Sequence, residues 1–234
     1  MLGMVLSSSM QLGCGADGPR QEVPAATLGT STQAEEALRP LVRRWTLGTT
    51  AERQALDSQL KTFCDRHVGD DLVRLALVLR GLNALERGQL DEAGGLVRGR
   101  EEEPQISPLF GPAGTTRDLA TLVLGASERR RGEFDRALTR LLPLLHKMLD
   151  GFATALLDEE LVLGAVGAKR WAAALFFMDV WQREAEPDRR AVVERRIRQL
   201  ISEVPTSELL ASLEQRVAGV PIEEGGDMAR LLTQ

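Results

Sequence analysis

Residues 74–97 read RLALVLRGLNALERGQLDEAGGLV, and their pattern predicts two antiparallel helices joined by a tight turn. Apolar residues recur three and four positions apart, which is the spacing of a helix with one buried face. Gly88 is expected in the turn, because glycine readily adopts the positive φ that ends a helix. Gly81 is expected to let the two helices approach closely. Leu90 then opens the second helix, and Ala93 lies where the facing helix leaves little room.

The same pattern occurs twice more along the chain. Residues 118–142 read DLATLVLGASERRRGEFDRALTRLL, and residues 160–181 read ELVLGAVGAKRWAAALFFMDVW, with the third turn at Lys169. The turns are 44 residues apart from Gly88 to Gly132, and 37 apart from Gly132 to Lys169. The pattern residues are Gly81, Gly88, Leu90 and Ala93, then Gly125, Gly132, Phe134 and Ala137, then Trp171 and Ala174.

These three units resemble the tetratricopeptide repeat, a helix–turn–helix unit of about 34 residues with small and aromatic residues at such offsets. The resemblance implies an all-α fold in which antiparallel helix pairs stack as a short α-solenoid over residues 34–218. It also implies a concave face that binds a protein partner. The wider first spacing is assigned to a loop at residues 101–116, EEEPQISPLFGPAGTT.

Helices are also expected on both sides of the repeats. Thr49 or Thr50 is expected to cap one of them, and Pro143 is expected to kink the helix that contains it. Residues 219–234 form a C-terminal tail, with a short helix as one interpretation. The flanking helices are predicted at residues 34–46, 51–67, 188–202 and 206–218.

The N-terminal segment has a different character from the rest of the chain. Residues 1–13, MLGMVLSSSMQLG, carry no charged side chain and lead directly into Cys14. Residues 14–33 are mostly small and polar, without a helical period. This order is typical of a short signal peptide, a processing site and a flexible, disordered tether.

The residues Leu12-Gly13-Cys14 resemble the end of a bacterial lipobox, although Gln11 departs from the aliphatic residue that the family prefers. The resemblance implies that Cys14 is lipidated. It also implies a lipoprotein of the bacterial envelope, anchored in the outer membrane and facing the periplasm. Elsewhere the sequence lacks the ~18 apolar residues of a spanning helix, so membrane contact is expected through the lipid alone.

The composition excludes some classes of protein. The net charge is −5, so no basic surface for nucleic acid is expected. His67 and His146 lie in different units without other ligands at metal spacing, so neither a metal nor another cofactor is expected. Cys64 is interpreted as a small buried residue, with a bridge to Cys14 as the alternative. No catalytic residues are predicted, and the protein is not expected to be an enzyme.

Several charged and aromatic residues have two interpretations. The triplet Arg129-Arg130-Arg131 is interpreted as favourable charge at a helix C-terminus, with the lip of a groove for an acidic peptide as the alternative. The acidic run Asp158-Glu159-Glu160 is interpreted as a helix-start cluster. Trp45, Trp171 and Trp181 are candidate interface anchors, with Trp171 assigned to the core by its repeat position and Trp181 left open between core and interface.

The C-terminal half, from Trp171 through residues 205–210, loosely resembles the repeat domain of lipoproteins that activate penicillin-binding proteins. This resemblance implies an envelope scaffold that binds a protein partner, for example a peptidoglycan synthase. Two alternatives remain open at this point. One is a small-ligand or sensory module of the envelope, and the other is a cytoplasmic adaptor whose N-terminus is not a signal.

Overall fold

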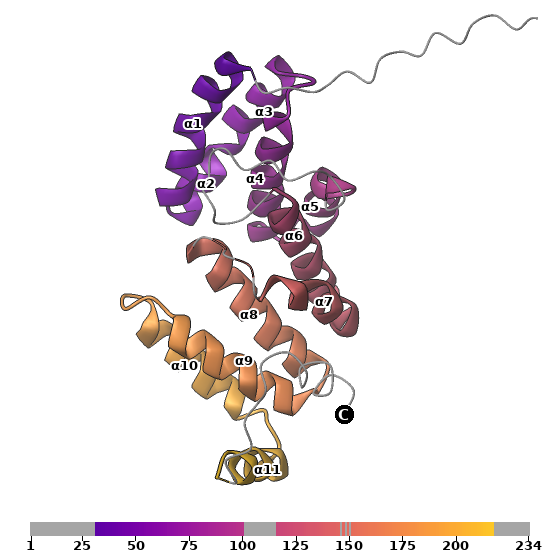
Figure 1. Ribbon diagram of the computed structural model, residues 1–234, viewed down its shortest axis with the longest axis vertical. Helices are drawn as coiled ribbons and strands as arrows, with labels where there is room; N and C mark the ends of the chain where they lie inside the picture. The colour runs from indigo at the N-terminus through magenta and orange to yellow at the C-terminus, as the bar shows by residue number, and fades with distance from the viewer. Residues whose placement is uncertain (1–30, 101–115, 146, 148, 150, 218–234) are drawn as a thin grey trace, which may run out of the picture.

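The computed structural model describes residues 31–100, 116–145, 147, 149 and 151–217. Within these residues every regular element is a helix, and the helices follow one another down the long axis of the molecule (Figure 1). The prediction of an all-α fold is therefore confirmed. The signal segment, Cys14, residues 14–30 of the tether, loop residues 101–115, His146 and the tail from residue 218 lie outside the described residues.

The helices have the following bounds. They are α1 Thr32–Leu47, α2 Thr50–Ala55, α3 Asp57–Arg66, α4 Leu72–Glu86, α5 Leu90–Val97, α6 Thr116–Arg130, α7 Phe134–Leu141, the 3-10 helix η2 Leu142–Leu144, α8 Gly151–Gly167, α9 Trp171–Glu184, α10 Arg190–Ile201 and α11 Thr206–Val217.

The N-terminal helices differ in detail from the expectation. The backbone N–H of Ala34 donates to Ser31 Oγ at 3.1 Å, and this cap starts α1 at Thr32, two residues before the predicted start. Thr49 caps α2 in a capping box with Glu52. The expected single helix over 51–67 is instead broken at Leu56, which is buried and separates α2 from α3.

Three helix hairpins, α4–α5, α6–α7 and α8–α9, have turns of the same backbone conformation. The turn residue has a positive φ in each, +74° at Gly88, +83° at Gly132 and +58° at Lys169. The following N–H closes the turn by donating back five residues, a pairing that ends helices in the Schellman motif. These hydrogen bonds are Gln89 to Ala84 at 2.9 Å, Glu133 to Glu128 at 3.0 Å and Arg170 to Ala165 at 2.9 Å.

Small residues allow close packing within the hairpins, as predicted. A Cβ at Gly81 would lie 2.7 Å from Val97 Cγ1, and one at Gly125 would lie 2.5 Å from Leu141 Cδ2. Ala93, Ala137 and Ala174 are fully buried. In the second hairpin α7 ends at Leu141, and Pro143 continues it as a 3-10 turn because proline lacks an N–H for the α-helical ladder.

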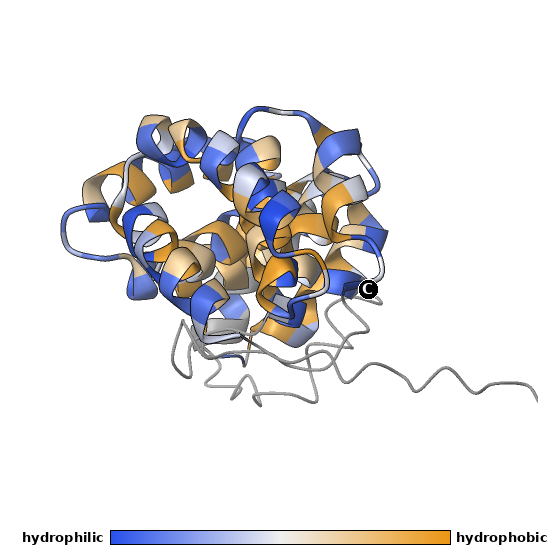
Figure 2. Ribbon diagram, turned by 90° about the horizontal axis from the view of Figure 1, so that it is seen from above, coloured by the Kyte–Doolittle hydropathy of each residue, from blue (hydrophilic) through white to orange (hydrophobic). Residues whose placement is uncertain are grey.

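The hairpins pack on one another in chain order. Among the first helices, α4 contacts α6 and α6 contacts α8, and α5 and α7 each contact the first helix of the next hairpin. Phe134 contributes to this packing, because its ring occupies the space beside Gly167 of α8. Viewed from above, the hydrophobic residues gather toward the middle of the helices and the hydrophilic residues toward the turns (Figure 2).

The conformation of the third turn leads to a prediction about stability, because Lys169 has a backbone conformation that glycine adopts without strain. Lys169→Gly is expected to raise the free energy of unfolding by about 0.5–1 kcal/mol, after the greater freedom of glycine in the unfolded chain is subtracted. Gly132→Ala is the matched control, since its Cβ would meet no atom within 4 Å and only the positive φ opposes it. That variant should be destabilised. Urea unfolding measures both changes, and a loss of stability in Lys169→Gly would contradict the argument.

Candidate functional site

The arginine triplet at the C-terminal end of α6 is bound within the protein. Arg129 Nη2 donates to Glu160 Oε1 at 2.8 Å, and Arg130 Nη2 donates to the same oxygen at 3.2 Å. Arg131 Nη2 lies 2.6 Å from Asp91 Oδ1 on the preceding hairpin. The triplet therefore ties the hairpins of α4, α6 and α8 together, and all three side chains already have acidic partners.

A second ion pair repeats this connection one hairpin later. Arg170 Nη2 lies 2.8 Å from Asp135 Oδ1. Asp91 and Asp135 occupy the same position, the second residue of α5 and α7 respectively. In each case an arginine from the turn of the next hairpin reaches back to it. Both aspartates are exposed, so we expect these two pairs to align the hairpins more than they stabilise them.

The prediction that residues 158–160 form a helix-start cluster is wrong. The helix α8 begins at Gly151, seven residues before Asp158, because the stretch GFATALL is free of charge and packs as part of the helix. Asp158 and Glu160 therefore lie in the middle of α8 and are 4% and 1% exposed. Glu160 has the two arginines as partners, whereas Asp158 has a different environment.

Asp158 lines a pocket of about 310 Å3 where α8, α9 and the start of α10 meet. Among the described residues, no hydrogen-bond donor or cation is paired with its carboxylate. A buried carboxylate without a partner is uncommon in a folded protein. The other lining residues are Leu149, Gly151, Thr154, Ala155, Trp181, Glu184, Ala185, Glu186, Arg189 and Val193.

Burial and, to a smaller extent, the nearby negative charge of Glu184 together raise the pKa of Asp158 to about 7. Both effects disfavour the charged carboxylate, since burial removes its hydration and a like charge repels it. Asp158 is therefore about half ionised at neutral pH. An arriving cation would favour the ionised form, so this pocket is the strongest candidate binding site in the described residues.

A second polar cluster joins the N-terminal helices to α8. Trp45 Nε1 donates to Asn83 Oδ1 at 2.8 Å, and the Arg53 guanidinium lies 4.4 Å from the ring centroid of Phe152. Arg53 also donates to Glu86 Oε1 at 2.7 Å. Most of these polar atoms are paired with one another, but Arg53 Nε and Glu86 Oε2 are buried without a hydrogen-bond partner among the described residues. We interpret this cluster as a structural connection between α1, α2, α4 and α8.

Trp45 and Trp171 differ from their predicted roles, and Trp181 takes the core alternative. Trp45 and Trp181 are 2% and 6% exposed and belong to the core, so neither is an exposed interface anchor. Trp171, which was assigned to the core, is half-buried. Its position is the one that Phe134 occupies in the second hairpin, where the ring packs on the first helix of the next hairpin. The third hairpin is followed by α10 and not by another repeat hairpin. The repeat pattern therefore could not predict which element packs on Trp171.

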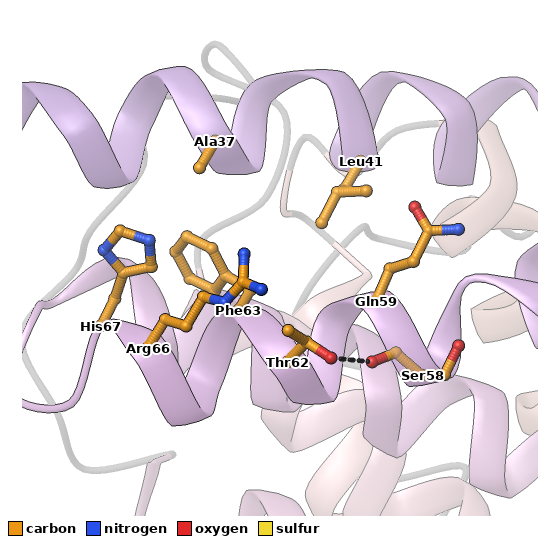
Figure 3. A pocket seen from close by; sticks show the side chains of 8 residues that line it. All are labelled: Ala37, Leu41, Ser58, Gln59, Thr62, Phe63, Arg66 and His67. Atoms are coloured by element: carbon orange, nitrogen blue, oxygen red, sulfur yellow. Dashed lines mark hydrogen bonds between the residues drawn. The ribbon is translucent and has the colours of Figure 1, made fainter.

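A shallow groove lies between α1 and α3 (Figure 3). Ala37 and Leu41 line it from α1, while the side chains from Ser58 to His67 line it from α3. His67 follows Arg66 as the C-cap of α3 and stacks on Phe63 with ring centroids 4.6 Å apart. Thr62 Oγ1 donates to the Ser58 carbonyl at 2.9 Å. The polar residues that line the groove are mostly exposed. We therefore interpret the groove as the boundary between two packed helices.

The remaining sequence expectations concern cysteine, metal and membrane. Cys64 is buried in the core as predicted, and burial raises its pKa. In the described part of the chain, no three His, Cys, Asp or Glu side chains gather as metal ligands. The helices described here include none that combines the length and apolar character needed to cross a membrane.

Comparisons with protein-family models, with curated proteins and with solved structures each return no match.

Proposed function

We propose that this protein is a tetratricopeptide-like scaffold that binds a protein partner on the face formed by its first helices. The observation that carries the proposal is the repeated hairpin, with one turn conformation and one ion-pair connection used again along the chain. Helix-pair repeats of this kind stack into α-solenoids whose concave faces bind peptides or helices.

The same proposal includes an anchor at Cys14. A lipidated Cys14, followed by the tether, would hold the scaffold at the bacterial envelope. The proposed location is the periplasmic side of the outer membrane. The support is the residue pattern around Cys14, which resembles a lipobox. A peptidoglycan synthase or another envelope complex is the proposed class of partner. The Asp158 pocket favours the second candidate function, a small-ligand or sensory module.

The partner-binding face is tested by site-specific photo-crosslinking in cells at two matched threonines. Thr121 is half-buried on the first helix α6, and Thr139 is exposed on the second helix α7. Each hydroxyl donates to the carbonyl four residues earlier at 2.9 Å, so replacing either one disturbs the helix similarly. We expect one discrete protein adduct from position 121 and little from position 139. Equal adducts at both positions, or none at position 121, would contradict the proposed face.

The anchor is tested in the same cells with Cys14→Ser. If Cys14 carries the lipid, this variant moves from the membrane fraction to the soluble fraction. If the partner is also an envelope protein, the variant loses the adduct at position 121 as well. A chain that partitions identically with and without Cys14 is not anchored there. An adduct that survives in the soluble fraction would support the scaffold and point to the cytoplasmic adaptor.

A further inference from the structure

The pocket around Asp158 has the features of a binding site that the proposed scaffold does not require. Asp158 is 4% exposed, and among the described residues its carboxylate lacks both a hydrogen-bond donor and a cation partner. An unpaired buried polar group normally costs stability. Glu160, two residues along the same helix, shows the usual solution, since two arginines surround it. The described lining residues give Asp158 no such partner.

The charges around the pocket select the sign of a ligand. Glu184 of α9 and Glu186 of the following connection line the pocket together with Asp158, and Arg189 is the single cation among the described lining residues. Glu186 is directed to the start of α8, because a Cβ at Gly151 would lie 2.6 Å from its Oε1. That position places its carboxylate near the positive end of the α8 dipole. Asp158 and Glu184 therefore remain to attract a cation.

The shape of the lining selects the kind of cation. A volume of about 310 Å3 is at the lower end of the range for small-ligand sites. Trp181, Val193 and Leu149 offer apolar surface for a short aliphatic chain. Asp158, Glu184 and the Thr154 hydroxyl offer acceptors for the three donors of an ammonium group. Metal coordination is less suited, because the described residues provide no cluster of three metal-ligating side chains.

We propose that the Asp158 pocket binds a primary alkylammonium group, with its head between Asp158 and Glu184 and its aliphatic chain against Trp181. A lysine side chain of a partner and a free aliphatic amine share this chemistry. The proposal concerns the isolated chain and is independent of whether the first-helix face binds a protein.

The test is isothermal titration calorimetry of the full chain at constant ionic strength with two probes, butylammonium chloride and a capped Gly-Lys-Gly peptide. Asp158→Asn is expected to weaken binding of the preferred probe about tenfold or more at pH 8, because a charge-assisted hydrogen bond is lost. Glu194→Gln on α10 is the matched control, since it removes the same charge from a side chain 36% exposed outside the pocket. It should leave binding unchanged.

The dependence on pH separates a ligand contact from a structural effect. With a pKa of about 7, the ionised fraction of Asp158 increases about tenfold between pH 6 and pH 8, so the affinity of the wild type should increase by about the same factor. The increase should vanish in Asp158→Asn. Glu184, Glu186 and Arg189 are the other charged groups among the described residues that line the pocket, and all three are unchanged in Asp158→Asn.

Each outcome of the titration has a defined meaning. Tighter binding of the peptide assigns the pocket to a partner's lysine, and tighter binding of butylammonium assigns it to a free amine. Equal affinity of the wild type and Asp158→Asn for both probes overturns the proposal, as does an affinity that is independent of pH. Circular dichroism of both variants verifies that they are folded. Loss of the photo-crosslink at position 121 has no bearing on this result.

Discussion

Replacing Glu160 by alanine is expected to destabilise the protein by about 3 kcal/mol or more, the usual cost of removing one partner from a buried ion pair. The Glu160 carboxylate is 1% exposed and receives hydrogen bonds from Arg129 and Arg130. Without it, two adjacent guanidinium groups remain partly buried next to each other at the contact of α6 with α8. Their mutual repulsion adds to the loss of the hydrogen bonds.

The neighbouring residue supplies the control. Glu159 is half-buried on the same helix, and Glu159→Ala is expected to change stability by less than about 1 kcal/mol. Urea unfolding of the two variants measures the difference. If both substitutions cost the same, the arginines of α6 do not depend on Glu160, and the proposed connection between the second and third hairpins is wrong. Loss of that connection is also expected to lower the cooperativity of unfolding.

The second large effect is a stability gain in Asp158→Asn that increases with pH. The pKa of Asp158 is about 7 in the folded protein and has an ordinary value of 3.8, so the folded state binds the proton more tightly than the unfolded state. Stability of the wild type therefore falls as the pH rises from about 4 to about 8. Asparagine does not titrate. The difference between the two proteins should increase by about 4 kcal/mol across this range, at one pKa unit per 1.4 kcal/mol.

This prediction is measured as the difference between two stability curves, because other carboxylates change the absolute curves of both proteins equally. Glu194→Gln should show no such trend, since Glu194 is a surface group on α10. A constant offset between wild type and Asp158→Asn at every pH would mean that Asp158 titrates normally. A variant that is more stable and yet binds the alkylammonium probe more weakly would separate the role of Asp158 in binding from any role in folding.

The repeat pattern predicted the local geometry of the hairpins well, for a physical reason. Gly88 and Gly132 appear in the turns because few other residues adopt a positive φ easily, and Gly81 and Gly125 appear where helices touch because any side chain would clash. Lys169 shows the limit of this reasoning. It has the same conformation as the glycines, and only its alignment with them, not its residue type, indicated a turn.

The predictions about charged and aromatic residues were less accurate, because their environments come from distant parts of the chain. The burial of Asp158 and Glu160 required α8 to begin at Gly151, and an uncharged stretch with few capping signals hid that start. The packing of Trp45 depends on Asn83, which lies 38 positions later in the chain. Helical periodicity indicates which face of a helix is apolar, but it contains no information on which neighbour covers that face.

By itself the sequence determined that the chain forms helices, where three of its turns fall and which small residues let paired helices pack closely. These features depend on backbone conformation and steric exclusion, which act over a few residues. Only the tertiary structure decided that two arginines at the end of α6 surround Glu160 and that Asp158, two residues away, faces a pocket without a partner among the described residues. Those environments arise because α6, α9 and α10 approach α8 from different sides, and a charge acquires its energetic role from the groups around it.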